Sequence, residues 1–395
     1  MNWPTFELSS IAEVKLGRQR SPQNHSGPSM RKYLRAGNIG WSGLLLDDVK
    51  EMNFTDDEMT TFRLEAGDLL LNEASGSPKE VGKPALWNGE IENCAFQNTL
   101  LRVRPSSDVE PRYLLHYFVY QAATGEFARG SRGVGINHLG REALSKWSVP
   151  LPPLNEQCRI AAILDQVDSL RTTARRRDSL LSALPGDIYS DMFGDAYQDE
   201  RWLVRRVDEV ARVQLGRQRS PKYQTGNYRR PYLRVANVYE DRLDLSDVLM
   251  MDFDDRDFID YRLSPGDILL NEGQSTELVG RPALFRGEIE DCCFQNTLLR
   301  VQVDETRVLP EFALATFLDY FRKGRFARLS SKTSSVAHLG KARLAAMPFP
   351  LPPLELQRRF CRLAEKARFV QRSADTTNLD QLFASLQSRA FRGGL

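Results

Sequence analysis

Short apolar runs bounded by glycine, proline and asparagine alternate with polar stretches over the first 150 residues of the chain. Residues 68–72 (DLLLN), 85–87 and 99–103 have the length and the boundaries typical of buried strands. Residues 112–120 and, in the second half of the chain, 311–321 carry apolar side chains at helical spacing. This mixture predicts α+β domains.

The period of the apolar positions changes after the proline-rich segment 150–154 (PLPPL). Apolar residues then alternate at three and four positions over about four heptads, which predicts a long helix with a coiled-coil seam. Pro185 and Gly186 are expected to kink or end this helix. A second copy of the seam follows the second PLPPL and is broken at 375–378. The predicted seam residues are Ile160, Ile163, Val167, Leu170, Phe360, Leu363, Ala367 and Val370.

Two arrangements of the helices fit this pattern. Each helix could pack separately on its own domain, or the two matching seams could pair with each other. Because a globular domain joins the first helix to the second, pairing favours an antiparallel coiled coil. That arrangement gives a dumbbell with internal pseudo-two-fold symmetry.

The apolar pattern recurs because the chain is an internal duplication. The heptapeptide LGRQRSP stands at 16–22 and at 215–221, and FQNTLLRV stands at 96–103 and at 294–301. The offset between matching segments stays between 198 and 200 residues, which is far longer than a solenoid repeat. We therefore expect four segments: a first domain at 1–150, a central helix at 151–197, a second domain at 198–350 and a C-terminal helix at 351–395.

Composition adds limits rather than a function. The 395 residues are 41% hydrophobic and 27% charged with a formal net charge of +2, as in an ordinary globular protein. Five cysteines without CxxC spacing argue against a disulfide framework or a zinc site. The chain has no signal-peptide pattern and no apolar run long enough for a membrane span, so a cytoplasmic location is expected. A nucleic-acid partner would have to be held by locally arranged basic residues.

Signatures of catalysis are missing from the sequence. There is no GxxxxGK[ST] phosphate loop and no GxGxxG, and the four histidines lack metal-helix spacing. PLPPL is similar to the N/D-P-P-Y/F motif of amino methyltransferases, but Leu151 and Leu351 cannot bond an amino group. Asp68 and Glu73 could suggest a nuclease, yet Glu73 is not followed by the usual lysine. We therefore predict no catalytic residue, no metal and no cofactor on this chain.

Three pairs of segments have the composition of a DNA-binding surface. Arg and Gln side chains in the GRQRSP loops match base edges and phosphates, although a solvated turn would look the same. The loops 72–81 and 271–279 differ between the halves, as either specificity loops or tolerant surface loops would. Basic residues lie among small ones at 129–138 and 328–338, where they could grip phosphates. The candidate DNA-binding residues are Arg18, Gln19, Arg20, Ser75, Ser77, Lys79, Arg132, Asn137, Arg217, Gln218, Arg219, Gln274, Ser275 and Lys332.

These motifs resemble those of one known family. Two variable domains, each closed by PLPPL and a long helix, are similar to the specificity subunit of type I restriction-modification systems. The resemblance rests on 150–157 (PLPPLNEQ), on 192–195 (MFGD) and on the chain end 388–395 (SRAFRGGL). It spans the whole chain. One departure is Leu356, where the first copy has Glu156.

The resemblance implies two target recognition domains that read the two halves of an interrupted double-stranded DNA site. It also implies two modification (methyltransferase) subunits that use S-adenosylmethionine and, where the system has them, restriction (translocase and nuclease) subunits that use ATP and Mg²⁺. No membrane partner is implied. A helical span of 155–184 at ~1.5 Å per residue is about 45 Å, or on the order of 13 base pairs. Because the two domains share so many motifs, we expect closely related, inverted half-sites. The rival readings are a protein-scaffolding or RNA-binding tandem module and, less favoured, an enzyme.

Overall fold

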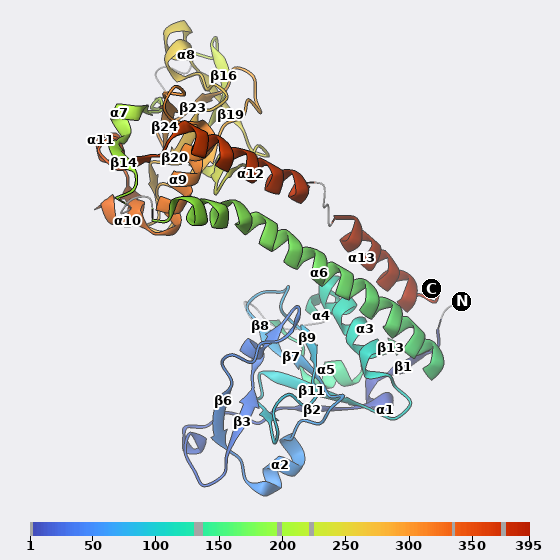
Figure 1. The fold of residues 1–395 in the computed structure, drawn as a ribbon. Coiled ribbons are helices and arrows are strands. Elements are labelled where there is room, and N and C mark those ends of the chain that lie inside the picture. Colours follow the sequence, from blue (N-terminus) through green and yellow to red (C-terminus); the bar gives the residue numbers. More distant parts are fainter. Residues whose placement is uncertain (1–2, 130–136, 196–199, 221–224, 334–335, 373–376) are drawn as a thin grey trace. The chain divides into compact units, whose positions relative to one another are not determined.

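The computed structural model describes residues 3–129, 137–195, 200–220, 225–333, 336–372 and 377–395. The chain forms two compact units of α+β structure (Figure 1). Unit 1 comprises residues 1–176 and 375–395, and unit 2 comprises residues 177–374. The C-terminal segment therefore belongs to the first unit rather than to the second.

Unit 1 is built around a four-stranded antiparallel sheet in the order β2-β11-β7-β9. The DLLLN run predicted as a strand is β7, and all four of its residues are buried because both faces of the sheet are covered. A three-stranded sheet, β10-β3-β6, carries a second cluster of apolar side chains. The elements of unit 1 besides α6 are β1 (Thr5–Glu7), α1 (Leu8–Ile11), β2 (Ala12–Leu16), η1 (Pro22–Asn24), β3 (Met30–Leu34), η2 (Ala36–Asn38), β4 (Ile39–Gly40), β5 (Gly43–Leu44), β6 (Lys50–Asn53), α2 (Asp56–Phe62), β7 (Leu69–Asn72), β8 (Ala74–Ser75), β9 (Pro84–Leu86), β10 (Ala95–Phe96), β11 (Leu100–Pro105), α3 (Pro111–Ala123), α4 (Glu126–Arg129), β12 (Asn137–His138), α5 (Arg141–Ser145), β13 (Ser148–Pro150) and α13 (Thr377–Phe391).

Unit 2 repeats the two larger sheets of unit 1 with the same strand order. Its four-stranded sheet has the order β15-β24-β20-β22 and its three-stranded sheet the order β19-β16-β23. The elements of unit 2 besides α6 are β14 (Leu203–Arg206), α7 (Val207–Val210), β15 (Ala211–Leu215), β16 (Arg229–Leu233), η4 (Val235–Asn237), β17 (Val238–Tyr239), β18 (Arg242–Leu243), β19 (Leu249–Asp252), α8 (Asp255–Tyr261), β20 (Ile268–Asn271), β21 (Gly273–Gln274), β22 (Pro282–Leu284), β23 (Cys293–Phe294), β24 (Leu298–Val303), α9 (Pro310–Arg322), α10 (Arg325–Leu329), β25 (Ser331–Thr333), β26 (Val336–His338), α11 (Lys341–Ala345), β27 (Pro348–Leu351) and α12 (Leu354–Arg372).

The long helix α6 (Leu154–Phe193) follows the first PLPPL, and its two parts belong to different units. It does not end at Pro185 but continues to Phe193. The predicted fold class is confirmed: two homologous α+β domains are followed by long helices. α12 ends at Arg372 and α13 begins at Thr377. Of the break expected at 375–378, residues 377–378 are helical and residues 375–376 lie outside the described residues.

In each unit, α6 has an antiparallel helical partner. In unit 1, Arg159 Nη2 donates to the Leu395 carbonyl at 3.1 Å and Arg171 Nε to Asp380 Oδ1 at 2.8 Å, so the pairing with α13 runs in opposite directions. In unit 2, Gln371 Nε2 donates to Ser182 Oγ at 2.6 Å, and the rings of Tyr189 and Phe360 are 5.8 Å apart. The helices therefore pair with each other rather than packing separately.

The buried face of these helices differs from the predicted seam. Ile160, Phe360 and Ala367 are buried and Ile163 and Val167 half-buried, as positions facing a partner should be. The prediction is wrong where it placed the next seam residue three positions further along the helix, because the buried face there continues at a spacing of four residues. Leu170, Leu363 and Val370 are exposed. Leu164 and Ala364, which the predicted seam left out, are buried. Among the described residues, no helix is both long and apolar enough to cross a membrane.

Candidate nucleic-acid interface

Backbone hydrogen bonds join the predicted binding loops of unit 1 into one continuous edge. Asn98 N donates to the Arg18 carbonyl at 3.0 Å, which fastens the GRQRSP loop to the FQNTLLRV segment. Glu73 N donates to the Thr99 carbonyl at 3.0 Å, and Leu139 N to the Glu73 carbonyl at 2.8 Å. We call this the polar edge; in unit 1 it comprises residues 17–20, 72–79, 97–99 and 137–138.

Unit 2 has the same edge with the same bonds. Asn296 N donates to the Arg217 carbonyl at 3.0 Å, Glu272 N to the Thr297 carbonyl at 2.9 Å, and Leu339 N to the Glu272 carbonyl at 2.8 Å. The polar edge of unit 2 comprises residues 216–219, 271–277, 295–297 and 336–338. Segments that are up to 120 residues apart in the chain are thus brought together twice in the same order.

Arg18 and Arg217 do not face outward as candidate base readers should. The Arg18 side chain is only 13% exposed, pairs with Glu58 at 2.5 Å and donates to the Asn53 carbonyl at 2.7 Å. Its guanidinium also lies 4.9 Å from the centre of the Phe54 ring. Arg217 repeats this environment, with an ion pair to Asp257 and a 2.9 Å bond to the Asp252 carbonyl. Arg18 therefore holds its loop to α2, and Arg217 holds its loop to α8.

The next residues of each loop are the ones that reach solvent. Gln19, Arg20, Gln218 and Arg219 are all exposed. Arg20 Nε donates to His25 Nε2 at 3.1 Å, which leaves most of its guanidinium donors available. Gly17 can come close to the FQNTLLRV segment because it has no side chain: a Cβ there would lie 2.2 Å from the Gln97 carbonyl oxygen.

The loop after β7 is clamped at its base and exposed at its tip. Asn72 N donates to the Lys83 carbonyl at 3.1 Å and Asn72 Nδ2 to the Glu80 carbonyl at 3.3 Å, so the loop closes on a buried asparagine. Gly82 has a φ of +70° and lies against Phe127, where a Cβ would be 2.3 Å from the ring. Ser77 and Lys79 are exposed and Ser75 is half-buried. The hydrogen bonds at the base therefore hold the loop in place while the side chains at its tip reach solvent.

Two of the predicted segments pair as strands. Asn137 lies opposite Ser75 in the β8–β12 ladder, and Gln274 lies opposite Ala337 in the β21–β26 ladder. Ser275 N donates to Gln274 Oε1 at 3.1 Å. Lys332 lies on β25, next to β26, while Arg132 falls outside the described residues.

A histidine–glutamate pair on each edge was not among the predicted site residues. His138 Nδ1 lies 3.2 Å from Glu73 Oε2, and His338 Nδ1 lies 3.1 Å from Glu272 Oε2. The histidine rings are 52% and 40% exposed, whereas the carboxylates are 18% and 17% exposed. The sequence does contain a sign of this pair, because the glutamate and the histidine both recur at matching positions of the duplication.

The acid of the GD motif is structural in both units. Asp68 is buried and accepts bonds from Arg104 Nε at 2.7 Å and Nη2 at 2.8 Å, and its Oδ2 also accepts from Glu65 N. Burial raises the pKa of the equivalent Asp267 despite bonds from Ser264 N and Gln302. Among the described residues, no group of three or more His, Cys, Asp and Glu side chains could hold a metal ion.

The glutamine three residues after each PLPPL motif explains why the motif precedes each helix. Gln157 is buried, accepts from Glu110 N at 2.9 Å and donates to the Pro152 carbonyl at 2.8 Å. Gln357 makes the matching bonds to Leu309 N and to the Pro352 carbonyl, both at 2.9 Å. Leu356 differs from Glu156 because it packs on the apolar core of unit 2, whereas Glu156 pairs with Arg159. The motif fixes the start of the helix on its domain.

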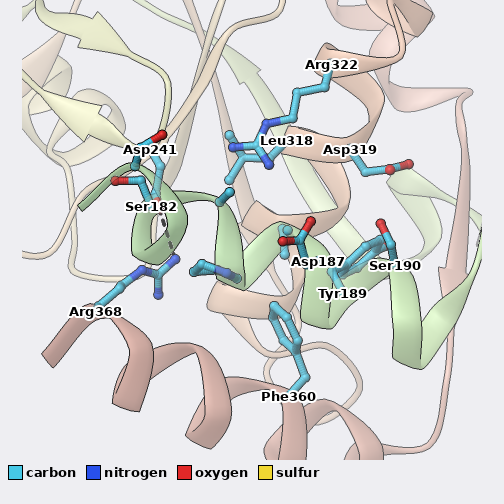
Figure 2. A pocket seen from close by; sticks show the side chains of 15 residues that line it. Ser182, Asp187, Tyr189, Ser190, Asp241, Leu318, Asp319, Arg322, Phe360 and Arg368 are labelled. Atoms are coloured by element: carbon cyan, nitrogen blue, oxygen red, sulfur yellow. Dashed lines mark hydrogen bonds and ion pairs between the residues drawn. The ribbon is translucent and has the colours of Figure 1, made fainter. Parts of the chain in front are cut away.

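Each unit also has a cavity between its helix pair and its domain. The cavity of unit 2 is about 540 Å³ and is lined by α6, α9, α12 and the turn before β18. In Figure 2, Arg368 reaches across it to Asp241, to which its Nη2 donates at 3.0 Å. Tyr189 and Phe360 lie at its other end, where they enter the core. The cavity of unit 1 lies in the corresponding place, at about 580 Å³ and against α3, α6 and α13. Neither cavity includes residues of the polar edge.

Comparison with known proteins gives one consistent result. Residues 1–181 match the family described as the type I restriction modification DNA specificity domain. The chain is 23% identical to the StySPI specificity subunit of Salmonella potsdam over 100% of this chain and 89% of that protein. It is 22% identical to the EcoKI specificity subunit of Escherichia coli K12 over 83% of this chain and 75% of that protein.

Solved structures agree on the fold. A chain from a study of complex assembly and conformational transition in the type I restriction-modification system matches with a TM-score of 0.59 and 17% identity, covering 100% of this chain and 98% of that one. The type I S subunit of M. genitalium matches with a TM-score of 0.55 and 12% identity, covering 99% and 96%.

Proposed function

We propose that this chain, which belongs to the family of type I restriction-modification specificity subunits, selects the DNA sequence on which such a complex acts. The observation that carries the proposal is the duplicated polar edge. In each unit it joins the same four segments by the same three backbone bonds and leaves polar side chains such as Gln19 and Gln218 exposed. Sequence is read by side-chain hydrogen bonds to base edges, and exposed amide and guanidinium groups are suited to them.

In this proposal the chain binds and positions, and its partners perform the chemistry. Two modification subunits with S-adenosylmethionine transfer the methyl group, and restriction subunits with ATP and Mg²⁺, where present, translocate and cleave DNA. Two features support a non-catalytic role. The GD-motif acid Asp68 is held by Arg104, and the loop arginine Arg18 is held by Glu58, so neither is presented to a substrate. The complex would act in the cytoplasm, where its DNA lies.

The proposed target is an interrupted site with two related, inverted halves. The motifs LGRQRSP and FQNTLLRV, with seven and eight residues, are identical in the two units. Within the polar edges, the loops 72–81 and 271–279 differ between the units, for example at Lys79, where unit 2 has Glu277. We expect the half-site centres to lie on the order of 13 base pairs apart, from ~1.5 Å of helix per residue over 155–184.

A selection experiment tests this function. The full-length chain with its modification subunits is incubated with a randomised duplex library, and bound DNA is sequenced over several rounds. We expect enrichment of one interrupted motif and affinity that falls steeply with salt, because phosphate contacts release counterions. No enrichment, with salt-insensitive binding or a preference for RNA, would favour the scaffold or RNA-binding alternative.

A further inference from the structure

The histidine–glutamate pairs join two neighbouring segments of each polar edge, and the proposed function so far gives them no role. The backbone of Glu73 bonds to Thr99 on one side and to Leu139 on the other, so the chain that carries its carboxylate is held beside His138. Glu272 is held in the same way by Thr297 and Leu339 beside His338. In both units the carboxylate is largely covered and the ring is open to solvent.

This geometry decides which hydrogen bond each ring can offer. An ionised carboxylate only accepts hydrogen bonds, so Nδ1 must carry the proton in the contacts of 3.2 Å and 3.1 Å. The neutral imidazole then has its lone pair on Nε2, at the end of the ring opposite the carboxylate. A carboxylate bound to one ring nitrogen fixes the tautomer and makes the other nitrogen a better acceptor, as it does for histidines that bind metals.

An acceptor backed by a carboxylate is a poor partner for phosphate, because both would be electron-rich and the carboxylate adds repulsion. It is a good partner for an exocyclic amino group. In the major groove, adenine presents N6–H₂ and cytosine presents N4–H₂, whereas guanine and thymine present acceptors in the equivalent places.

We infer that His138 and His338, positioned by Glu73 and Glu272, each accept a hydrogen bond from an amino-bearing base in their own half-site. The inference rests on the proposed function and deepens it by naming two specificity residues and the kind of base they read. Because both pairs are identical and both are embedded in the same bonds, the two half-sites carry an adenine or cytosine at equivalent positions.

The selection experiment with single variants tests this directly. His138→Ala is expected to lose about five- to tenfold of the preference for an amino-bearing base at one position of one half-site, the worth of one base-edge hydrogen bond. The other half-site serves as an internal control, because its reader is unchanged. His338→Ala should give the reciprocal result. His138→Gln, which keeps a polar side chain of similar size, should broaden the base choice at the same position.

Glu73→Gln separates a positioning role from a merely structural one. The amide can either accept from Nδ1 or donate to it, so Nε2 is no longer fixed as the acceptor. We expect the preference at that position to weaken while affinity for unrelated duplex DNA is unchanged or rises, since a negative charge has been removed near the phosphates. A structural role alone would lower both together with the thermal unfolding midpoint.

The outcomes are distinguishable. If the wild-type complex enriches an interrupted motif and the histidine variants keep every base preference, the inference is wrong and the proposed function stands. It is also wrong if the variants lose affinity equally for all sequences, as phosphate contacts would. A wild-type complex that enriches no motif contradicts both.

Discussion

Arg18 and Gln19 are neighbours in the chain, yet one is a structural cation and the other a surface group. Arg18 uses Nη1 for the Asn53 carbonyl and Nη2 for Glu58, with Phe54 beneath the guanidinium plane. These partners come from β6 and α2, so nothing adjacent in the sequence marks the difference. Substitution of Arg18 should therefore lower the stability of unit 1, whereas substitution of Gln19 should not.

We predict that Arg18→Ala lowers the stability of unit 1 by about 2–4 kcal/mol, because it leaves the half-buried Glu58 carboxylate and the Asn53 carbonyl without their donor. Arg18→Lys should recover only part of this, since one ammonium cannot replace both arms of the fork. Chemical unfolding of the full chain gives the measurement. Gln19→Ala, at an exposed position, is the matched control and should change stability by less than about 0.5 kcal/mol. Equal effects of the two variants would contradict the assignment.

Thiol reactivity gives a second test at the scale of single residues. Burial raises the pKa of Cys94, Cys292 and Cys293 to about 12 each and that of Cys361 to about 11, so their reactive thiolate forms are scarce at neutral pH. Cys158 is exposed. We expect a maleimide reagent to modify Cys158 first in the native protein and all five cysteines after unfolding. Mass spectrometry of early time points would contradict the packing if Cys94 reacted as fast as Cys158.

At the same scale, sequence reasoning did not distinguish the loop side chains that face solvent from those that are held inside. Gln19, Arg20, Ser77 and Lys79 are exposed, and their contacts with DNA stay a prediction. Whether a loop arginine faces in or out depends on acidic and aromatic partners about 35 to 40 residues away. Pattern and composition do not carry that information.

At the scale of elements, α13 completes the core of unit 1 although the chain reaches it last. The Phe391 ring lies 5.6 Å from Tyr113 and 5.2 Å from Tyr117, both on α3, and Trp3 Nε1 donates to the Ala390 carbonyl at 2.9 Å. Phe193 occupies the matching place in unit 2, 5.1 Å from Phe312. In each domain, the core thus includes a phenylalanine from the last residue of a long helix: Phe391 of α13 in unit 1 and Phe193 of α6 in unit 2.

We predict that Phe391→Ala destabilises unit 1 by about 3–5 kcal/mol, as expected for deleting a buried phenylalanine in a packed core. Leu382→Ala is the control on the same helix, because Leu382 is 48% exposed and should cost little. Differential scanning calorimetry of the full chain should show the lower transition for the first variant only. Equal transitions would mean that α13 contributes nothing to the core of unit 1.

The pairing of α6 with α13 should also depend on pH. Hydrogen bonds from Arg171, together with the charge of Arg175, hold the pKa of Asp380 below its usual value. A lowered folded-state pKa adds stability that is present above the unfolded pKa and is lost as pH falls through the folded value. Asp380→Asn should therefore unfold at a lower temperature than the wild type near neutral pH, with the gap closing below about pH 4. A gap that persists unchanged at low pH would contradict the ion pair.

The elements themselves were largely predictable, and the errors have a physical origin. DLLLN is β7, and the helices expected at 112–120 and 311–321 are α3 and α9. Spacing of three and four residues fits more than one helix face, however, so the predicted seam included Leu170, which is exposed, and left out Leu164, which is buried. Pro185 was expected to kink or end α6; the helix does not end there and runs on to Phe193.

At the scale of the whole molecule, duplication gives two equivalent polar edges, from which we expect two related half-sites. Long-read sequencing that detects methylated bases can compare cells making this chain and its modification subunits with cells lacking the chain. We expect methylation at one interrupted motif with closely related inverted halves, and its loss when the chain is deleted. Methylation at two unrelated half-sequences would contradict the equivalence of the edges, and a methylome unchanged by the deletion in an active system would contradict the function.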